Sequence, residues 1–213
     1  MVRYKSVQKL KKNLDNDESI MDDIHNYVEQ ITIPWNDCLS ENSNRSIAIV
    51  SGCVLDQLLE KLISAYFIKD KGVKNLFTND HILQSLFSKI QIAFYSGLIA
   101  RPFYHDLNNI CKIRNKFAHH ISANLTFQDT SISNIINNCE LRPRDPEIKS
   151  AKVKYIIIVA TLIYWLCLAE RFLSKYQLLY PFEYFDFEKI PFHELAPSKS
   201  YLIEFIRKSI PSC

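Results

Sequence analysis

Glycine is scarce in this chain, with three among 213 residues. Sandwiches and barrels depend on many tight turns, and glycine is the residue that such turns favour. Apolar residues recur instead at intervals of three and four, which is the periodicity of an amphipathic helix. The scarcity of glycine and this periodicity argue against a sandwich or barrel and predict an all-α fold, an antiparallel helical bundle.

The chain also lacks a strong net charge and closely spaced pairs of cysteines. The formal charge of +3 is too small to indicate nucleic-acid binding by itself, although a local basic patch can still bind a polyanion. The six cysteines contain no C-x-x-C pair, so we expect small buried hydrophobic residues rather than metal ligands or bridges. The sequence predicts no metal site and no cofactor.

A membrane span and a signal peptide are not expected either. The longest apolar run, residues 155–169, is shorter than the roughly twenty residues that cross a bilayer, so it predicts a central buried helix. Residues 1–5 lack the basic, apolar and small-residue order of a signal peptide. We therefore expect a cytoplasmic protein without a membrane partner.

Capping residues predict where two of the helices begin and end. One long helix is expected after Ser43 or Asn44, because both residue types are favoured N-caps. Asn79 or Asp80 is expected to cap the next helix, whose apolar face includes Phe87. Gly97 suits the left-handed position that ends this helix.

Prolines and polar stretches predict the remaining boundaries. Pro34 is expected to end a helix that passes through residues 24–31. Pro102 suits the first turn of the helix that ends in residues 112–120, which is called the motif helix. Residues 121–150 are rich in Asn, Ser and Thr and predict a connection, either a plain surface loop or a lid beside the site. A strong helix is expected over Lys152–Tyr176.

The composition divides the chain into three segments. Residues 1–41 form an N-terminal helical segment, whose lysines indicate either a loosely docked helix or a basic arm for a phosphate backbone. Residues 42–176 form the main helical domain. Residues 177–213 form an irregular extension rich in aromatics and prolines, which either wraps its own core or binds a partner.

The segment Lys112–His120 closes the motif helix and holds the candidate site. Four apolar residues make one stripe on this helix: Phe103, Leu107, Ile110 and Phe117. Arg114 falls within the stripe, where a guanidinium is costly unless it is paired or hydrogen-bonded. Asn115 and His119 lie one turn apart, but Arg114 and His119 point about 140° apart on an ideal helix. One straight helix would therefore not aim both at the same atom.

Arg114-Asn115 followed by His119 resembles the R-polar-xxx-H signature of the HEPN superfamily of small all-α domains. The runs 83–107 and 45–60 resemble the mannitol repressor (MltR-like) branch of that superfamily. The resemblance covers roughly residues 42 to 176 and implies a HEPN-type bundle. Short motifs need such surrounding context to carry weight.

The resemblance implies metal-independent RNA cleavage, as in HEPN toxins and defence nucleases. Histidine, as a residue type, can move a proton at neutral pH, which suits His119. Arg114 would hold the phosphate, and Asn115 would orient the imidazole or donate to a phosphate oxygen. We expect a homodimer in which two motif helices face each other across a basic cleft, with an antitoxin as a possible further partner. Three further residues are expected to bind nucleic acid: Lys112, Lys116 and His120.

An alternative interpretation makes the motif structural. Arg114 would then pair with a core carboxylate, Asp56 or Glu60, and the domain would be a noncatalytic interaction module. The resemblance to the mannitol repressor branch implies such a role, that of a regulator of transcription that acts through a protein partner. His105 and Asp106 could form a catalytic dyad, but neighbouring residues on a helix diverge, so they are expected to be surface polarity.

Overall fold

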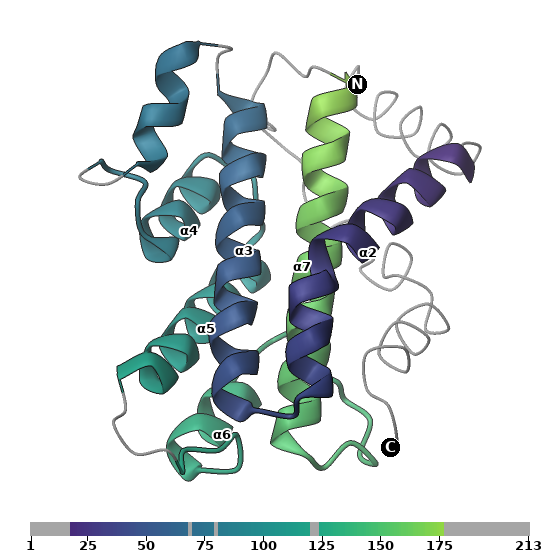
Figure 1. The fold of residues 1–213 in the computed structure, drawn as a ribbon, viewed down its shortest axis with the longest axis vertical. Coiled ribbons are helices and arrows are strands. Elements are labelled where there is room, and N and C mark those ends of the chain that lie inside the picture. The colour runs from purple at the N-terminus through teal and green to yellow at the C-terminus, as the bar shows by residue number, and fades with distance from the viewer. Residues whose placement is uncertain (1–17, 68–69, 79–80, 120–123, 177–213) are drawn as a thin grey trace, which may run out of the picture.

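The computed structural model describes residues 18–67, 70–78, 81–119 and 124–176. Within these ranges every regular element is a helix and none is a strand, and the helices pack into one bundle (Figure 1). The predicted all-α fold is confirmed. The N-terminal lysines and the C-terminal extension lie outside the described residues.

Two long helices form the centre of the bundle, α3 (Asn44–Tyr66) and α7 (Ala151–Tyr176). They lie side by side and point in the same direction, while α2 (Glu18–Ser40) runs antiparallel to both (Figure 1). The predicted cap of α3 is confirmed, because the Ser43 hydroxyl accepts a hydrogen bond from the backbone N–H of Ser46 at 3.2 Å.

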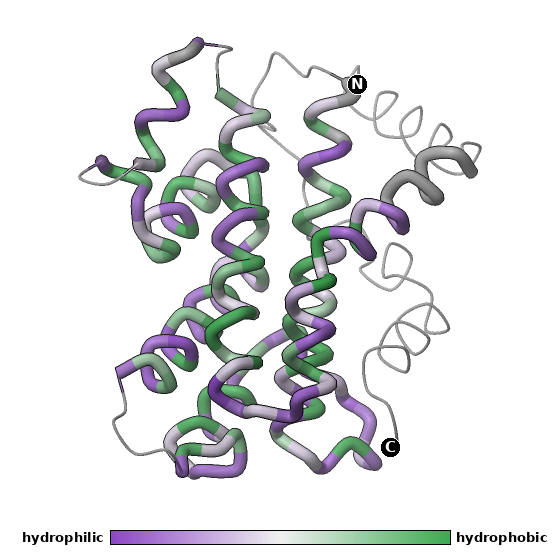
Figure 2. The backbone as a smooth tube through the Cα atoms, in the orientation of Figure 1, coloured by the Kyte–Doolittle hydropathy of each residue, from purple (hydrophilic) through white to green (hydrophobic). Residues whose placement is uncertain are grey.

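Three shorter helices cover the remaining sides of this pair. Helices α4 (Leu86–Tyr95) and α5 (Arg101–His119) pack against α3, and α6 (Thr130–Asn137) packs between α5 and α7. A short 3-10 helix, η1 (Lys71–Phe77), also contacts α3. Figure 2 shows hydrophobic residues alternating with hydrophilic ones along α3 and α5, as expected for helices with one buried face.

The prediction that Pro34 ends its helix is wrong, because α2 continues through Pro34 to Ser40. Proline lacks the N–H that would bond one turn back, and α2 is visibly bent in Figure 1. The Thr32 hydroxyl donates to the Val28 carbonyl at 2.7 Å just before the proline. Trp35 follows it, fully buried, and its indole N–H donates to the Ser51 hydroxyl of α3 at 2.8 Å. This anchor holds the second half of α2 on the bundle despite the proline.

The prediction for α4 is confirmed at its end and wrong at its beginning. Gly97 has φ of 73°, the left-handed conformation expected there. The helix is capped by Ser85, which accepts from the N–H of Ser88 at 3.0 Å, and Asn79 and Asp80 lie outside the described residues. Phe87 is 55% exposed, so it is not on the buried face that the sequence predicted.

Residues 121–150 are more than the predicted connection, since they contain α6. Ile132 and Ile136, one helical turn apart, are fully buried, and Phe127 lies between the rings of Phe117 and Tyr155. A segment with this much buried surface is part of the bundle and not a plain surface loop.

Helix α7 confirms the predicted central helix. Residues Ala151–Arg171 are long and apolar enough to cross a membrane by length and composition, and 56% of that window is buried inside the protein. The apolar side chains of α7 pack against α2, α3, α5 and α6, and this packing accounts for the apolar sequence of the helix.

The cysteines mostly follow the prediction of small buried residues. Cys111, Cys139 and Cys167 are buried, whereas Cys53 is exposed, and no disulfide joins any of the cysteines in the described residues. Burial, together with Asp106 near Cys139 and Glu170 near Cys167, raises the pKa of each of these two thiols to about 12.

These two thiols predict a loss of stability at alkaline pH. In the folded protein they stay protonated up to about pH 12, whereas in the unfolded chain they ionise near their ordinary pKa of 9.0. Their contribution to the free energy of unfolding is therefore complete below about pH 9, and it is lost as the pH rises from there towards 12. We expect the free energy of unfolding to fall by about 1.5 kcal/mol between about pH 8 and about pH 9.5 from these thiols. Urea denaturation of the wild type and of the Cys139→Ala/Cys167→Ala variant at both pH values measures this, and an equal fall in both would contradict it.

Candidate functional site

Helix α5 presents one apolar face and one basic face. The four apolar residues of the predicted stripe are buried as expected: Phe103, Leu107, Ile110 and Phe117. From Asn108 to His119 the helix contains no acidic residue. The opposite face of its last turns is therefore uniformly basic or neutral, which favours an anionic ligand.

Arg114 lies at the seam between the two faces, as the sequence predicts. Its side chain is partly buried, and its stem crosses the backbone of Gly52 in α3. One guanidinium nitrogen, Nη1, donates to the Asn115 Oδ1 at 3.0 Å. The Asn115 side-chain amide in turn donates to the Cys111 Sγ at 3.9 Å. The structure thus joins Arg114 and Asn115 and fixes both ends of the asparagine amide.

The thiol of Cys111 remains a neutral member of this group. Burial raises the pKa of Cys111, and Asp56 adds to this effect, while the positive charges of Arg114 and Lys112 lower it. A protonated thiol does not neutralise the guanidinium beside it, so the positive charge of Arg114 is retained.

The predicted pairing of Arg114 with Asp56 or Glu60 is wrong. Both carboxylates instead bind Lys89 of α4, each at 2.9 Å from its Nζ, and Lys89 is only 2% exposed. A lysine buried to this extent needs such partners. In the part of the chain described here, no carboxylate bonds to Arg114, and the neutral Asn115 takes that place.

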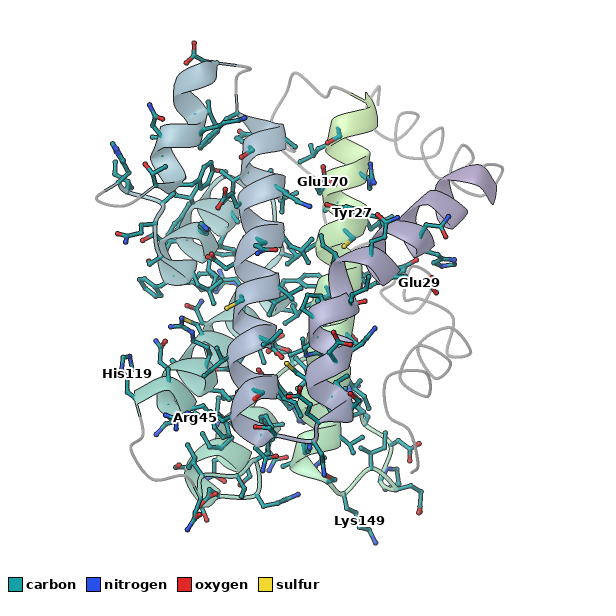
Figure 3. All side chains as sticks on the ribbon, viewed as in Figure 1. Tyr27, Glu29, Arg45, His119, Lys149 and Glu170 are labelled. Carbon is teal, nitrogen blue, oxygen red and sulfur yellow. The ribbon has the colours of Figure 1, made fainter. Side chains whose placement is uncertain are left out.

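The other predicted site residues lie on the exposed face of α5. Lys112, Asn115, Lys116 and His119 are all exposed, and His120 lies outside the described residues. Figure 3 shows His119 projecting outward at the end of α5. Arg45, which the sequence did not single out, joins this face, since its Nη2 donates to the Ala118 carbonyl at 3.3 Å. The N-terminus of α3 therefore adds a cation to the end of α5.

Arg114 and His119 do not meet within one chain. No hydrogen bond joins His119 to Arg114 or to Asn115 in the described residues, although both are on the same helix. This agrees with the divergence of about 140° expected for a helical separation of five residues. A single α5 can bind a phosphate with Arg114 but does not direct His119 to the same atom.

Asp106 has a structural role that the sequence did not indicate. It is fully buried and accepts hydrogen bonds from the backbone N–H groups of Glu140 and Leu141, both at 2.8 Å. The Nδ1 of His105 lies 3.1 Å from its Oδ1. The prediction of surface polarity for this pair is wrong for Asp106. The sequence offers little sign of this role, because the partners of Asp106 are more than thirty residues away along the chain. The one available signal was that Asp106 is next to Leu107, a residue of the apolar stripe.

Comparison with known proteins identifies no family for this chain. No family model matches it, and no curated protein matches it. Among solved structures, a chain in the X-ray structure of the MtlR–HPr complex from Escherichia coli is similar, with 21% identity and a TM-score of 0.44. The similarity covers 66% of this chain and 98% of that chain. Membership of the HEPN superfamily stays a prediction from the motif.

Proposed function

We propose that the basic face of α5 binds the phosphate backbone of RNA and that Arg114, Asn115 and His119 cleave it. The observation that carries this proposal is that Arg114 donates a hydrogen bond to the neutral side-chain amide of Asn115. If Arg114 had only a structural role, it would be expected to pair with a carboxylate instead. A guanidinium held in this way retains its charge and its remaining donors for a phosphate. Lys112 and Lys116 lie on the same helix face and add positive potential.

Cleavage would follow from an attack within the RNA itself. The ribose 2'-OH loses its proton to a base and its oxygen bonds to the adjacent phosphorus, while the bond from phosphorus to the 5'-oxygen breaks. The leaving oxygen takes up a proton, so the products are a 2',3'-cyclic phosphate and a free 5'-OH. Arg114 would stabilise the charge that develops on the phosphate oxygens.

The divergence of Arg114 and His119 supports a two-fold dimer for this reaction. Two copies of α5 facing each other would bring the arginine of one copy towards the histidine of the other. Two histidines would also supply one group to accept the proton and another to donate it. An antitoxin that covers the same face would be a natural partner of such a nuclease.

A second candidate function is a noncatalytic regulator that acts through a protein partner. The observation in its favour is that one chain does not assemble Arg114 and His119 into one site. Three large apolar side chains beside and on α4 are also exposed, Ile82, Phe87 and Tyr95, and such side chains suit a protein interface. The predicted cytoplasmic location suits either function.

Cleavage of bulk tRNA in EDTA separates the two candidates. We expect the wild type to produce fragments with cyclic phosphate ends, and Arg114→Ala to lose this activity with an unchanged circular dichroism spectrum. Loss of the helical spectrum in Arg114→Ala would instead indicate a structural arginine. If the folded wild type does not cleave, the catalytic part of the proposal is rejected.

RNA binding tests the basic face independently of catalysis. Contacts from Lys112, Arg114 and Lys116 to three phosphates predict an affinity that falls about 20-fold between about 50 and about 200 mM salt for a single strand. Lys116→Ala should make the negative slope of log affinity against log salt shallower by about 0.7. Lys149 is also exposed and lies apart from His119 in Figure 3, so Lys149→Ala is the matched control. Equal slopes for both variants would place the RNA elsewhere.

A further inference from the structure

Gly52 occupies an unfavourable place for a glycine. It lies in the interior of α3, is buried, and follows Ser51, which anchors Trp35. Glycine destabilises a helix interior relative to alanine, because it loses more backbone freedom on folding. Its backbone conformation is ordinary for a helix, since the positive φ angles in the described chain are at Asn42 and Gly97. The explanation for a glycine must therefore come from what lies against it.

The neighbour against Gly52 is the stem of Arg114. A Cβ atom placed on Gly52 would lie 2.8 Å from the Cγ of Arg114, 3.4 Å from its Cβ and 3.6 Å from its Cδ. The first of these distances is well inside the contact distance of two carbon atoms. Cγ is close to the root of the side chain, so an added methyl group would force a new rotamer on Arg114 or move α5 away from α3.

We propose that Gly52 is a positioning residue that sets where the Arg114 guanidinium presents its donors to phosphate. This inference rests on the proposed RNA-binding function of the α5 face. The missing side chain at Gly52 lets the stem lie flat on α3, and the Asn115 amide holds the other end of Arg114 through the bond of 3.0 Å. The guanidinium is thus located by a contact at its root and a hydrogen bond at its tip.

The alternative role for Gly52 is close packing of α3 against α5 without any effect on the ligand. The two roles differ in their dependence on Arg114. Arg114→Met separates them, because methionine keeps a stem with a Cγ atom but has no guanidinium. If Gly52 serves the guanidinium, an added methyl group changes RNA affinity only while the guanidinium is present. If it serves helix packing alone, the effect on affinity persists in Arg114→Met.

A double-mutant cycle on RNA affinity measures this dependence. Gly52→Ala is expected to weaken binding of single-stranded RNA about tenfold, the value of one displaced charge-assisted hydrogen bond. Arg114→Met should weaken binding at least as much, and the Gly52→Ala/Arg114→Met double variant should bind no worse than Arg114→Met. In the Arg114→Ala background, Gly52→Ala should raise Tm, because only the helix preference for alanine remains.

Gly72→Ala is the matched control. An added Cβ there would meet the carboxylate tip of Asp70 at 2.9 Å, which is the flexible end of a side chain, and η1 is not part of the α5 face. We expect it to leave RNA binding unchanged. An equal loss of affinity from Gly52→Ala in the wild-type and Arg114→Met backgrounds would overturn the inference.

The remaining outcomes are also decisive. If Gly52→Ala fails to fold and Arg114→Ala restores the fold, the contact at the stem is supported, and failure to restore it rejects the inference. If Arg114→Ala binds RNA as well as the wild type, the proposed function itself fails, whatever Gly52→Ala does.

Discussion

His119→Ala is expected to reduce the rate of RNA cleavage in EDTA by at least about 100-fold, the lower range for loss of a general acid or base. RNA affinity should change by less than about threefold, since Lys112, Arg114 and Lys116 make the proposed phosphate contacts. His119 is exposed at the end of α5 and makes no bond to the Arg114–Asn115 pair in the described chain. Its removal therefore leaves the phosphate-binding groups in place. Single-turnover cleavage and filter binding on the same RNA measure the two quantities.

His81→Ala is the matched control for this experiment. His81 is also exposed, but it lies just before α4, away from the basic face. We expect His81→Ala to cleave RNA at the wild-type rate. Undiminished cleavage by His119→Ala would remove His119 from the reaction and direct attention to His120.

Asp106→Ala is expected to lower the free energy of unfolding by about 3 kcal/mol, because two backbone N–H groups lose a charged acceptor. The carboxylate is fully buried in α5 and bonds to Glu140 and Leu141 at the end of the segment that contains α6. Without it, α5 loses its polar link to that segment. Denaturation in urea at pH 7 measures the change. The free energy of unfolding of Asp106→Asn should lie between those of Asp106→Ala and the wild type, because asparagine keeps one acceptor oxygen.

A carboxylate in an exposed loop provides the comparison for Asp106. Asp145 accepts a bond from the backbone N–H of Glu147 at 3.0 Å, but water can replace it there. We expect Asp145→Ala to change the free energy of unfolding by less than about 0.5 kcal/mol. If Asp106→Ala is no more destabilising than this, the buried link does not stabilise the fold.

Local chemistry made part of the fold predictable from sequence. The Ser43 cap and the left-handed Gly97 depend on the residue itself and its nearest neighbours, and both are confirmed. Pro34 follows an equally local rule, yet α2 passes through it because Trp35 bonds to Ser51, which is sixteen residues away. A propensity rule does not include that distant anchor.

The candidate site shows the same division. Periodicity placed Arg114 at the edge of the apolar face, and the structure has it partly buried there. Periodicity could not show that Asp56 and Glu60 are taken by Lys89, because the choice between two cations depends on how α4 packs on α3. The approach of Gly52 to Arg114 joins two helices and leaves no pattern in either segment.

The order of the helices along the chain has a consequence for synthesis. Helix α7 is the most extensive partner of α3, yet about 110 residues separate their C-terminal ends. At the usual speed of a ribosome, these residues take roughly 5 to 20 s to emerge. During that interval the apolar surface of α3 that α7 will cover stays open to water, and apolar surface exposed in this way during folding is prone to aggregation.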